Sequence, residues 1–324
     1  MGIRSFYYRN IPYKHLYMLE KNERNLDKKR DLQAIRLERF IKSNDLSNIR
    51  VENRPVCIIA DGTWDYPLFT VNFFDNMVGC LIYCLAEGYA PSIKYCNSKN
   101  VSLWDQLLIQ PYGNDIIQEP VRVCDEPSPA FHFPIFPSEN DIKFYGKIFK
   151  LFFALNKRTR QYFVKEEKLI KDKRVVGVLC RGTDYTSNKP KRHPVQPRVS
   201  DVVGEVRKKM EEYRCDYIYL PTEEARTEQI FEEAFPGKII TNVRQYYDSY
   251  YDLLEQDGEN TRISWVHFDR DNDDYLKSLE YMSSINLLSK CNIFIGGNCG
   301  GSRAALYLNC GQYEYNNMFN LGVY

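Results

Sequence analysis

The chain has 324 residues, with 44 Lys and Arg against 43 Asp and Glu, so its formal net charge is +1. Hydrophobic residues make up 44% and aromatic residues 14% of the chain, which excludes an intrinsically disordered protein. The balanced charge argues against a general nucleic-acid binder, which needs a basic excess, but not against a small phosphate ligand. Because domains usually hold about 100–200 residues, we expect a soluble enzyme of two domains.

The residues up to Asn53 are charged and typical of helices. Between His15 and Lys42 the sequence has no Gly or Pro, and apolar residues are spaced among Lys, Arg and Glu, namely Leu16, Leu19, Leu26, Ile35 and Phe40. This spacing predicts one or two amphipathic helices. Two interpretations remain open: an appendage packed on the body of the protein, or helices that contact a partner, a membrane surface or a second copy of the chain.

An α/β pattern follows these helices. Residues 55–60 (PVCIIA) predict a buried strand that runs into an Asp-Gly loop, which carries Asp61 and Asp65. An apolar helix from about Phe73 to Glu87 and a second strand at 91–96 come next. The region 112–137 is rich in Pro and predicts an extended connection, and residues 141–171 predict one long helix that links two domains.

A second α/β series occupies the C-terminal half. We predict strands at 173–180, 216–220, 238–241 and 291–295, and helices at about 200–213, 223–235, 274–290 and 303–309. Repeated alternation of strand and helix predicts a parallel sheet covered on both faces. Ligands of such sheets bind beyond the carboxyl ends of the strands. The loops after the strands are therefore the places to look for functional residues.

The first of these loops begins with CRGTDY at residues 180–185. Arg181 can bind a phosphate with two hydrogen bonds, and Asp184 can orient it, although an Arg–Asp pair that only holds the loop is the alternative. The loop continues into the most basic segment of the chain, which holds Lys189, Lys191, Arg192, His193 and Arg198. This stiff, Pro-containing segment suits an anionic ligand or a solvated surface loop.

The other two loops offer a helix cap and a glycine-rich turn. In PTEEA at 221–225, Thr222 can cap the next helix with Glu223 and Glu224 in its first turn, or these residues can accept hydrogen bonds from a ribose. GGNCGGS at 296–302 lies between a strand and a helix, where backbone N–H groups can approach a phosphate. It matches neither a Walker A sequence nor a Rossmann dinucleotide motif.

The ten cysteines form no C-x-x-C pair. Four of them lie in apolar runs and predict buried thiols, namely Cys57, Cys180, Cys291 and Cys310. Cys80 and Cys84 could be half of a metal site, but no second pair completes it, so we predict no metal and no cofactor. Because the first residues do not form a signal peptide and no run is long enough to span a membrane, we predict a cytoplasmic location.

Three motifs of the C-terminal half occur in a fixed order: the R-G-T-D loop, the T-E-E strand end, and the run LLSKCNIFIGG before the small residues that start a helix. Together they resemble the three motifs of the GDP-fucose-dependent fucosyltransferase superfamily. That superfamily includes α1,2-, α1,6- and protein-O-fucosyl branches, and the chain looks most similar to bacterial proteins beside surface-polysaccharide pathways. The resemblance covers about Val175 to Asn309.

The resemblance implies an α/β protein with a GT-B-like architecture: two facing Rossmann-like domains, the sugar-nucleotide donor in the C-terminal one and the acceptor in the cleft. We expect an N-terminal helical extension at 1–53, an acceptor-side domain with the linking helix at 54–171, and a donor-nucleotide domain at 172–324. The implied reaction is an inverting transfer that needs no metal.

The resemblance also assigns roles to residues. Arg181 matches the family's Arg that binds the donor diphosphate. The family has Ser or Thr residues that contact the phosphates, and the residues at the matching positions of this chain are Asn298, Cys299, Gly300 and Ser302. The chain departs from the family at Leu179, where the family has His. Several branches place an Asp for the guanine base on the helix before the last strand, so either Glu280 substitutes for it or the base differs.

An inverting transfer needs a group that takes the proton of the acceptor hydroxyl. We prefer Asp61, in the first strand-end loop of the N-terminal domain, and His193 is the alternative because its unperturbed pKa lies near neutrality. The resulting prediction is transfer of fucose from GDP-fucose to a hydroxyl of a surface glycan, with no nucleic acid as partner. The alternatives are another sugar-nucleotide donor, or a catalytically silent protein that binds a nucleotide or a glycan.

Overall fold

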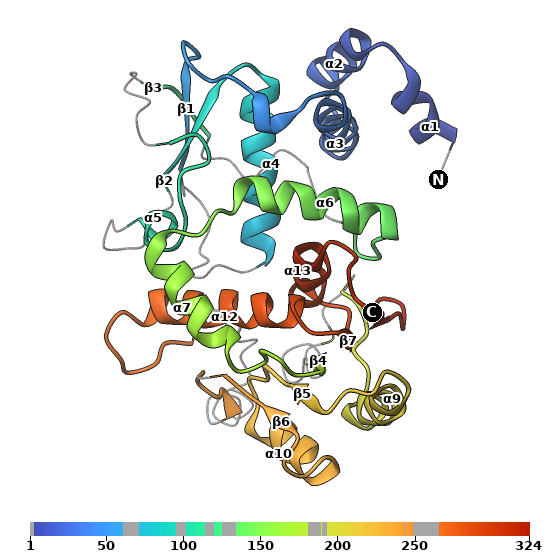
Figure 1. Cartoon of the computed structure of the whole chain (residues 1–324). Helices are drawn as coiled ribbons and strands as arrows, with labels where there is room; N and C mark the ends of the chain where they lie inside the picture. The colour runs from blue at the N-terminus through green and yellow to red at the C-terminus, as the bar shows by residue number, and fades with distance from the viewer. Residues whose placement is uncertain are drawn as a thin grey trace. The chain divides into compact units, whose positions relative to one another are not determined.

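A computed structural model describes residues 3–60, 71–94, 102–113, 120–124, 134–180, 189, 193–242, 244–248 and 266–324 (Figure 1). The chain forms two compact units. Unit 1 comprises Met1–Asp65, Asn72–Phe133 and Lys150–Asn156, and unit 2 comprises Tyr66–Val71, Pro134–Phe149 and Lys157–Tyr324. Residues 134–149 and 157–171, which we expected in the N-terminal domain, therefore group with unit 2.

Unit 1 begins with three helices: α1 (Ile3–Asn10), α2 (Tyr13–Asn22) and α3 (Leu26–Ser43), followed by the 3-10 turn η1 (Leu46–Asn48). The predicted helical pattern is thus confirmed, but it is divided at Asn25, whose side chain accepts a hydrogen bond from the Lys28 N–H and caps α3. Leu16 and Ile35 of the pattern are buried in a small core together with Ile11 and Leu32, which the pattern did not include, whereas Leu19 is exposed.

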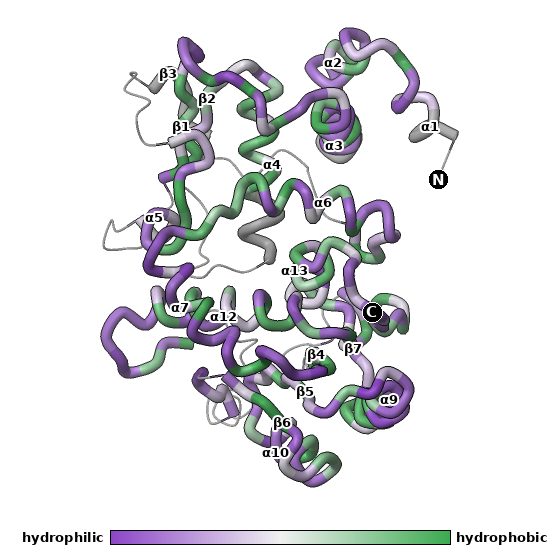
Figure 2. Tube along the Cα trace, viewed as in Figure 1, coloured by the Kyte–Doolittle hydropathy of each residue, from purple (hydrophilic) through white to green (hydrophobic). Residues whose placement is uncertain are grey.

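The rest of unit 1 is a three-stranded parallel sheet in the order β2-β1-β3. Its strands are β1 (Val56–Ala60), β2 (Ala90–Lys94) and β3 (Pro120–Cys124), and its helices are α4 (Val71–Ala86) and α5 (Leu103–Leu107). The second part of α4, residues 77–85, is apolar and buried (Figure 2). The two predicted strands and the helix between them are confirmed, whereas β3 lies in the Pro-containing region that we predicted to be an extended connection.

A buried guanidinium joins α3 to α2 and to the end of α4. The Arg36 side chain is fully buried, pairs with the Glu20 carboxylate, and donates to Glu87 Oε1 at 2.8 Å. Two aromatic rings, those of Tyr17 and Tyr83, lie within 5.2 and 6.0 Å of the guanidinium. The helices α2 and α3 and the end of α4 are therefore connected through a charge that has no access to water.

Arg36→Met should lower the free energy of unfolding by about 3–5 kcal/mol, because it leaves the Glu20 carboxylate buried without its partner. Urea denaturation of the full chain measures this. The matched control is Arg30→Met, at an exposed position of the same helix, which should have little effect. Adding Glu20→Leu to Arg36→Met should restore most of the loss, since the fully buried charges are then both gone and Glu87 still has Lys21 as a partner at 3.5 Å. Equal effects of the two Arg→Met variants would contradict the assignment.

The single linking helix predicted at 141–171 is wrong. The structure has two helices, α6 (Glu139–Phe152) and α7 (Lys157–Glu167). Between them the chain turns toward residues 107–109: Ile109 donates its N–H to Ala154 at 2.8 Å, and Asn156 donates to Leu107 at 3.1 Å. These backbone groups pair with a segment about fifty residues away instead of continuing the helix, and no local pattern records such a contact.

Unit 2 contains a five-stranded parallel sheet in the order β6-β5-β4-β7-β8. The strands are β4 (Val175–Leu179), β5 (Tyr217–Tyr219), β6 (Ile239–Ile240), β7 (Ile293–Gly297) and β8 (Tyr315–Phe319). The first four confirm predicted strands, with shorter or shifted ends. The fifth, β8, was not predicted, because its sequence YNNMF lacks the β-branched run of a buried strand.

Helices cover this sheet as the alternation predicted. They are α9 (Val199–Glu212), α10 (Ala225–Ala234), α12 (Asp273–Ser289) and α13 (Gly300–Asn309), arranged around the strands in Figure 1. One core packs α9 and α10 on the sheet, with Val176, Val178, Ile218 and Ile295 at its centre. The strand order reverses between β4 and β7, so unit 2 is a doubly wound, Rossmann-like sheet with its switch point there.

Two further predictions concern the whole chain. Of the eight cysteines whose side chains the structure describes, six are buried: Cys57, Cys80, Cys84, Cys215, Cys291 and Cys299. The predicted burial is thus confirmed for Cys57 and Cys291, whereas Cys180 and Cys310 are only half-buried. Within the described residues, no helix combines the length and the apolar character needed to cross a bilayer.

Candidate functional site

The candidate site lies at the carboxyl edge of the sheet of unit 2, where three loops follow β4, β5 and β7. Residues 179 and 296 are paired across the switch point, so the loops after β4 and β7 start side by side. Of the predicted residues, Arg181, Asp184 and Asp61 fall outside the described part of the chain. Their roles remain predictions.

The loop after β7 leads directly into the N-terminus of α13. Cys299 is the N-cap residue and makes no side-chain cap, and the first backbone bond of the helix runs from Arg303 N–H to the Cys299 carbonyl at 3.1 Å. The N–H groups of Gly300, Gly301 and Ser302 therefore have no acceptor within α13. Such N–H groups and the positive end of the helix dipole are suited to bind an anion.

The side chains of this loop are engaged in the loop itself. Ser302 is fully buried and donates its hydroxyl to the Gly297 carbonyl at 2.5 Å, and the Cys299 thiol lies 3.4 Å from the same hydroxyl. Asn298 donates to the Ile135 carbonyl at 2.9 Å and accepts from Arg303 at 3.1 Å. A phosphate at this end of α13 would thus be bound by backbone groups, while these side chains hold the shape of the loop.

In the loop after β5, the predicted cap is wrong. The Thr222 hydroxyl accepts from the Glu224 N–H at 3.2 Å, but α10 begins at Ala225, so Glu223 and Glu224 lie before its first turn and not in it. The helix is capped instead by the Asp248 carboxylate, which accepts from Ala225 N–H at 2.9 Å. A carboxylate brought by tertiary folding is a stronger acceptor than the local hydroxyl, and its charge suits the helix dipole.

Glu223 is held in place by a guanidinium that the sequence did not indicate. Arg244 donates to the Glu223 carboxylate at 3.2 Å and to the Pro221 carbonyl at 2.7 Å. Arg244 itself is mostly buried. The loop after β5 is therefore rigid, and its acidic residue carries a neutralising partner.

The ends of the central strands come close enough to influence one another. The pKa of the Cys180 thiol is raised to about 12, mainly by burial and in smaller part by the Glu224 carboxylate and the Cys299 thiol. Cys180 follows β4, Glu224 follows β5 and Cys299 follows β7. These three loops thus share one neighbourhood, as the parallel sheet predicted.

Glu280, the predicted base-binding residue, lies on α12 and is paired. The Arg270 guanidinium donates to both of its carboxylate oxygens, at 2.7 and 3.1 Å, and also to Asp273 at 2.6 Å. A bidentate pair of this kind is strong and directional. The carboxylate of Glu280 therefore has a fixed orientation.

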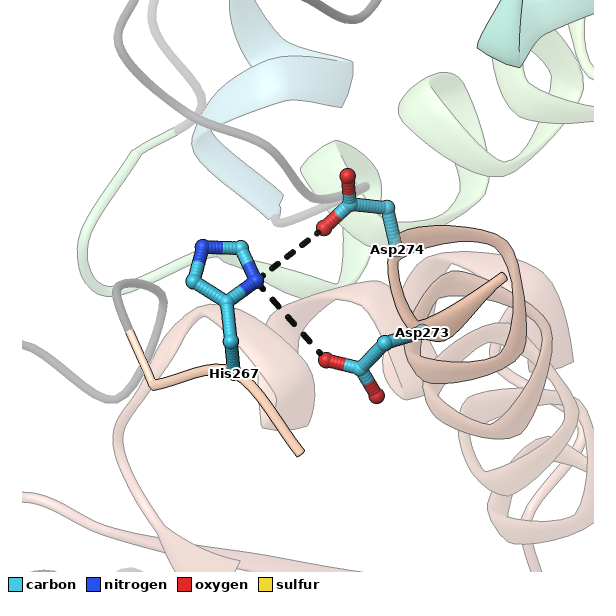
Figure 3. Close-up of side chains that lie close together, drawn as sticks. All are labelled: His267, Asp273 and Asp274. Atoms are coloured by element: carbon cyan, nitrogen blue, oxygen red, sulfur yellow. Dashed lines mark ion pairs between the residues drawn. The ribbon is translucent and has the colours of Figure 1, made fainter. Parts of the chain in front are cut away.

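Asp273 also belongs to a group with His267 and Asp274 that has the residue types of a metal site (Figure 3). His267 Nδ1 lies 3.9 Å from Asp273 and 3.7 Å from Asp274. However, Asp273 already binds Arg270, and Lys277 Nζ lies 3.6 Å from it. Because two cations would oppose a divalent ion there, the group is an ion-pair network that holds the N-terminus of α12.

A buried polar chain links β5, β6 and α12. Tyr219 donates its hydroxyl to Asn242 at 2.8 Å, and Asn242 donates to the Ser284 hydroxyl at 3.2 Å. Glu166 of α7 is only 8% exposed beside this chain. Burial raises the pKa of the Glu166 carboxyl; the hydrogen bond from Asn242 opposes this shift, and the Glu280 carboxylate adds to it.

Because the folded protein holds the Glu166 proton more tightly than the unfolded chain, this group stabilises the fold at low pH. That contribution is lost as the pH rises through its raised pKa. Glu166→Gln should therefore raise Tm by a few degrees at pH 8 and leave it unchanged at pH 4. Melting curves of the full chain at both pH values measure this, with Glu211→Gln, at an exposed position, as the control. A variant less stable than the parent at pH 8 would contradict it.

His193, the alternative base, has an exposed side chain, and its carbonyl accepts from the Tyr324 N–H at 3.0 Å.

Three residues beside the candidate site were not predicted: Arg244, Arg270 and Gln196. Arg244 and Gln196 have no local signal beyond residue type, because Arg244 binds Glu223 and Gln196 binds Asn298, which are distant in sequence. Only the spacing of Asp and Arg at 269–274 (DRDNDD) indicates locally that ion pairs could form there.

No protein-family model matches the chain, and no curated protein matches it. Among solved structures, POFUT1 in its apo form is similar, with a TM-score of 0.48, 10% identity, and coverage of 84% of this chain and 99% of that one. POFUT1 in complex with GDP gives a TM-score of 0.46 at 10% identity, covering 83% and 99%. A mutant of Arabidopsis thaliana FUT1 in complex with GDP gives 0.43 at 7% identity, covering 94% and 76%. We draw no functional conclusion from similarities of this size.

Proposed function

We propose that the chain is a glycosyltransferase that uses a nucleoside-diphosphate sugar, with GDP-fucose as the donor. The observation that carries this proposal is the N-terminus of α13, where three N–H groups without a helical acceptor follow the end of β7 that pairs with the end of β4 at Leu179. The loop after β4 carries Arg181. Backbone N–H groups and a guanidinium together are the groups expected around a diphosphate that is bound without a metal.

In the proposed reaction, the acceptor hydroxyl oxygen attacks the anomeric carbon of the donor sugar. The bond between that carbon and the diphosphate oxygen breaks, and GDP leaves with the electron pair, so the anomeric configuration is inverted. Arg181 and the N–H groups of α13 stabilise the charge that grows on GDP. Asp61 receives the hydroxyl proton, with His193 as the alternative base.

The remaining predicted residues take supporting roles in this proposal. Asp184 orients Arg181, Thr222 and Glu223 contact the ribose, and Glu280 contacts the base. Glu223 and Glu280 are each paired with an Arg, but a carboxylate offers about four acceptor positions, so one guanidinium leaves capacity for a ligand. We further propose a cytoplasmic enzyme with a surface glycan as acceptor.

GDP should raise the Tm of the chain, and ADP, UDP and NAD should raise it less. A ligand that binds only the native state adds about 2.7 kcal/mol at a hundred times its Kd, which corresponds to several degrees for a protein of this size. A thermal-shift screen measures the response. Arg181→Ala should remove it without changing the Tm of the unliganded protein.

The same screen separates the alternatives. A larger shift with another nucleoside diphosphate would identify a different donor. The absence of a shift with every nucleoside diphosphate would refute the proposed function, and a normal GDP response in Arg181→Ala would make that residue structural.

Asp61→Asn should abolish sugar transfer while GDP binding persists, because the amide cannot accept the hydroxyl proton. His193→Gln should retain transfer if Asp61 is the base. Release of GDP from GDP-fucose in the presence of a mixture of glycan acceptors measures both variants. The reverse result would assign the base to His193, and GDP binding without any turnover in the parent protein would indicate a silent binding protein.

A further inference from the structure

Two segments of unit 2 that are distant in sequence pair directly behind the candidate site. Tyr324 donates its N–H to the His193 carbonyl at 3.0 Å, and Val195 donates its N–H to the Gly322 carbonyl at 3.0 Å. The pairing is antiparallel. The residues after β8 therefore hold the main chain of His193 at the end of the basic loop.

Gln196 connects this pairing to the loop after β7. Its Nε2 donates to the Pro194 carbonyl at 3.1 Å and to the Asn298 carbonyl at 2.8 Å. The side chain is 6% exposed, and both hydrogens of its amide are used. One hydrogen bond lies within the segment of Gln196, and the other reaches the glycine-rich loop. Gln196 therefore fixes the distance between its own segment and that loop.

The close approach depends on a glycine. A Cβ atom at Gly297 would lie 2.1 Å from Gln196 Oε1 and 3.1 Å from Pro197 Cδ. Any larger residue at 297 would push the Gln196 amide away from Asn298. This explains one glycine of the motif by packing against Gln196 and not by contact with a ligand.

The bond to Asn298 also sets the direction of the next N–H group. In a trans peptide the C=O of one residue and the N–H of the following residue point in opposite directions. With the Asn298 carbonyl held by Gln196, the Cys299 N–H must point to the other side, and α13 starts from that peptide. The Asn298 side chain is held as well, by Ile135 and Arg303.

We propose that Gln196, together with the segment 322–324, is the positioning element of the candidate site. It holds the His193 segment and the N-terminus of α13 at the spacing that lets one nucleoside diphosphate contact both loops. The identity of the ligand in this inference rests on the proposed function. The coupling of the two loops is independent of that function.

The test uses two independent variants in the full chain. Gln196→Met keeps the length of the side chain and removes both donors. Tyr324→Pro removes only the N–H that binds His193, and Tyr324→Ala, which keeps that N–H, is its matched control. For each we measure the unliganded Tm, the Kd for GDP, and hydrogen exchange of the amides at 299–302.

Gln196→Met and Tyr324→Pro should each weaken GDP binding about tenfold, because each variant removes one hydrogen bond that joins two segments, and should speed exchange at 299–302. Tyr324→Ala should match the parent in both. A fall in Tm without a change in Kd would mean a purely structural role and would overturn the proposal.

If the parent protein binds no nucleoside diphosphate, the proposed function fails. Hydrogen exchange alone then tests whether Gln196 and the segment 322–324 hold the two loops together. Faster exchange in Tyr324→Pro but not in Tyr324→Ala would still support the coupling of the loops. Unchanged exchange in both Gln196→Met and Tyr324→Pro would overturn it.

Discussion

The parallel pairing of β4 with β7 is the constraint on which the rest of unit 2 depends. The two strands are separated by more than a hundred residues in the chain, yet Leu179 lies opposite Gly296. Parallel neighbours end at the same edge, so the loop with Arg181 and the glycine-rich loop must start together. The helix after β7 then begins at that edge, where the N–H groups of its first turn have no acceptor within the helix.

Several charged side chains of this protein form ion pairs in its interior. Arg36, Arg244 and Arg270 are mostly or fully buried, and each binds at least one carboxylate. Paired charges of this kind orient loops and helices at a cost in desolvation, so they specify geometry more than they add stability. The formal net charge of +1 therefore includes charges that are paired in the interior. It does not describe the charge of the surface that a ligand meets.

Periodicity and β-branched runs were sufficient to predict the strands that form the centres of the two sheets, such as β1, β4 and β7. They failed where the structure depends on distant contacts. The break between α6 and α7 follows from backbone bonds to residues 107–109, and α10 is capped by Asp248 and not by Thr222. For the candidate site, the sequence located the strand-end loops, but not the contacts of Arg244 with Glu223 and of Gln196 with Asn298, which join segments that are distant in the chain.

By itself, the sequence determined that unit 2 is a parallel α/β sheet, that its glycine-rich loop opens a helix, and that the loops after its strands hold the candidate residues. These follow from local propensity and from the alternation of elements, which act over a few residues at a time. Only the tertiary structure decided what each loop residue touches: that Ser302 and Asn298 bond to the main chain, that Glu280 is held by Arg270, and that Gln196 joins two loops. Hydrogen bonds and ion pairs need groups within about 3 Å, and only folding brings distant segments to that separation.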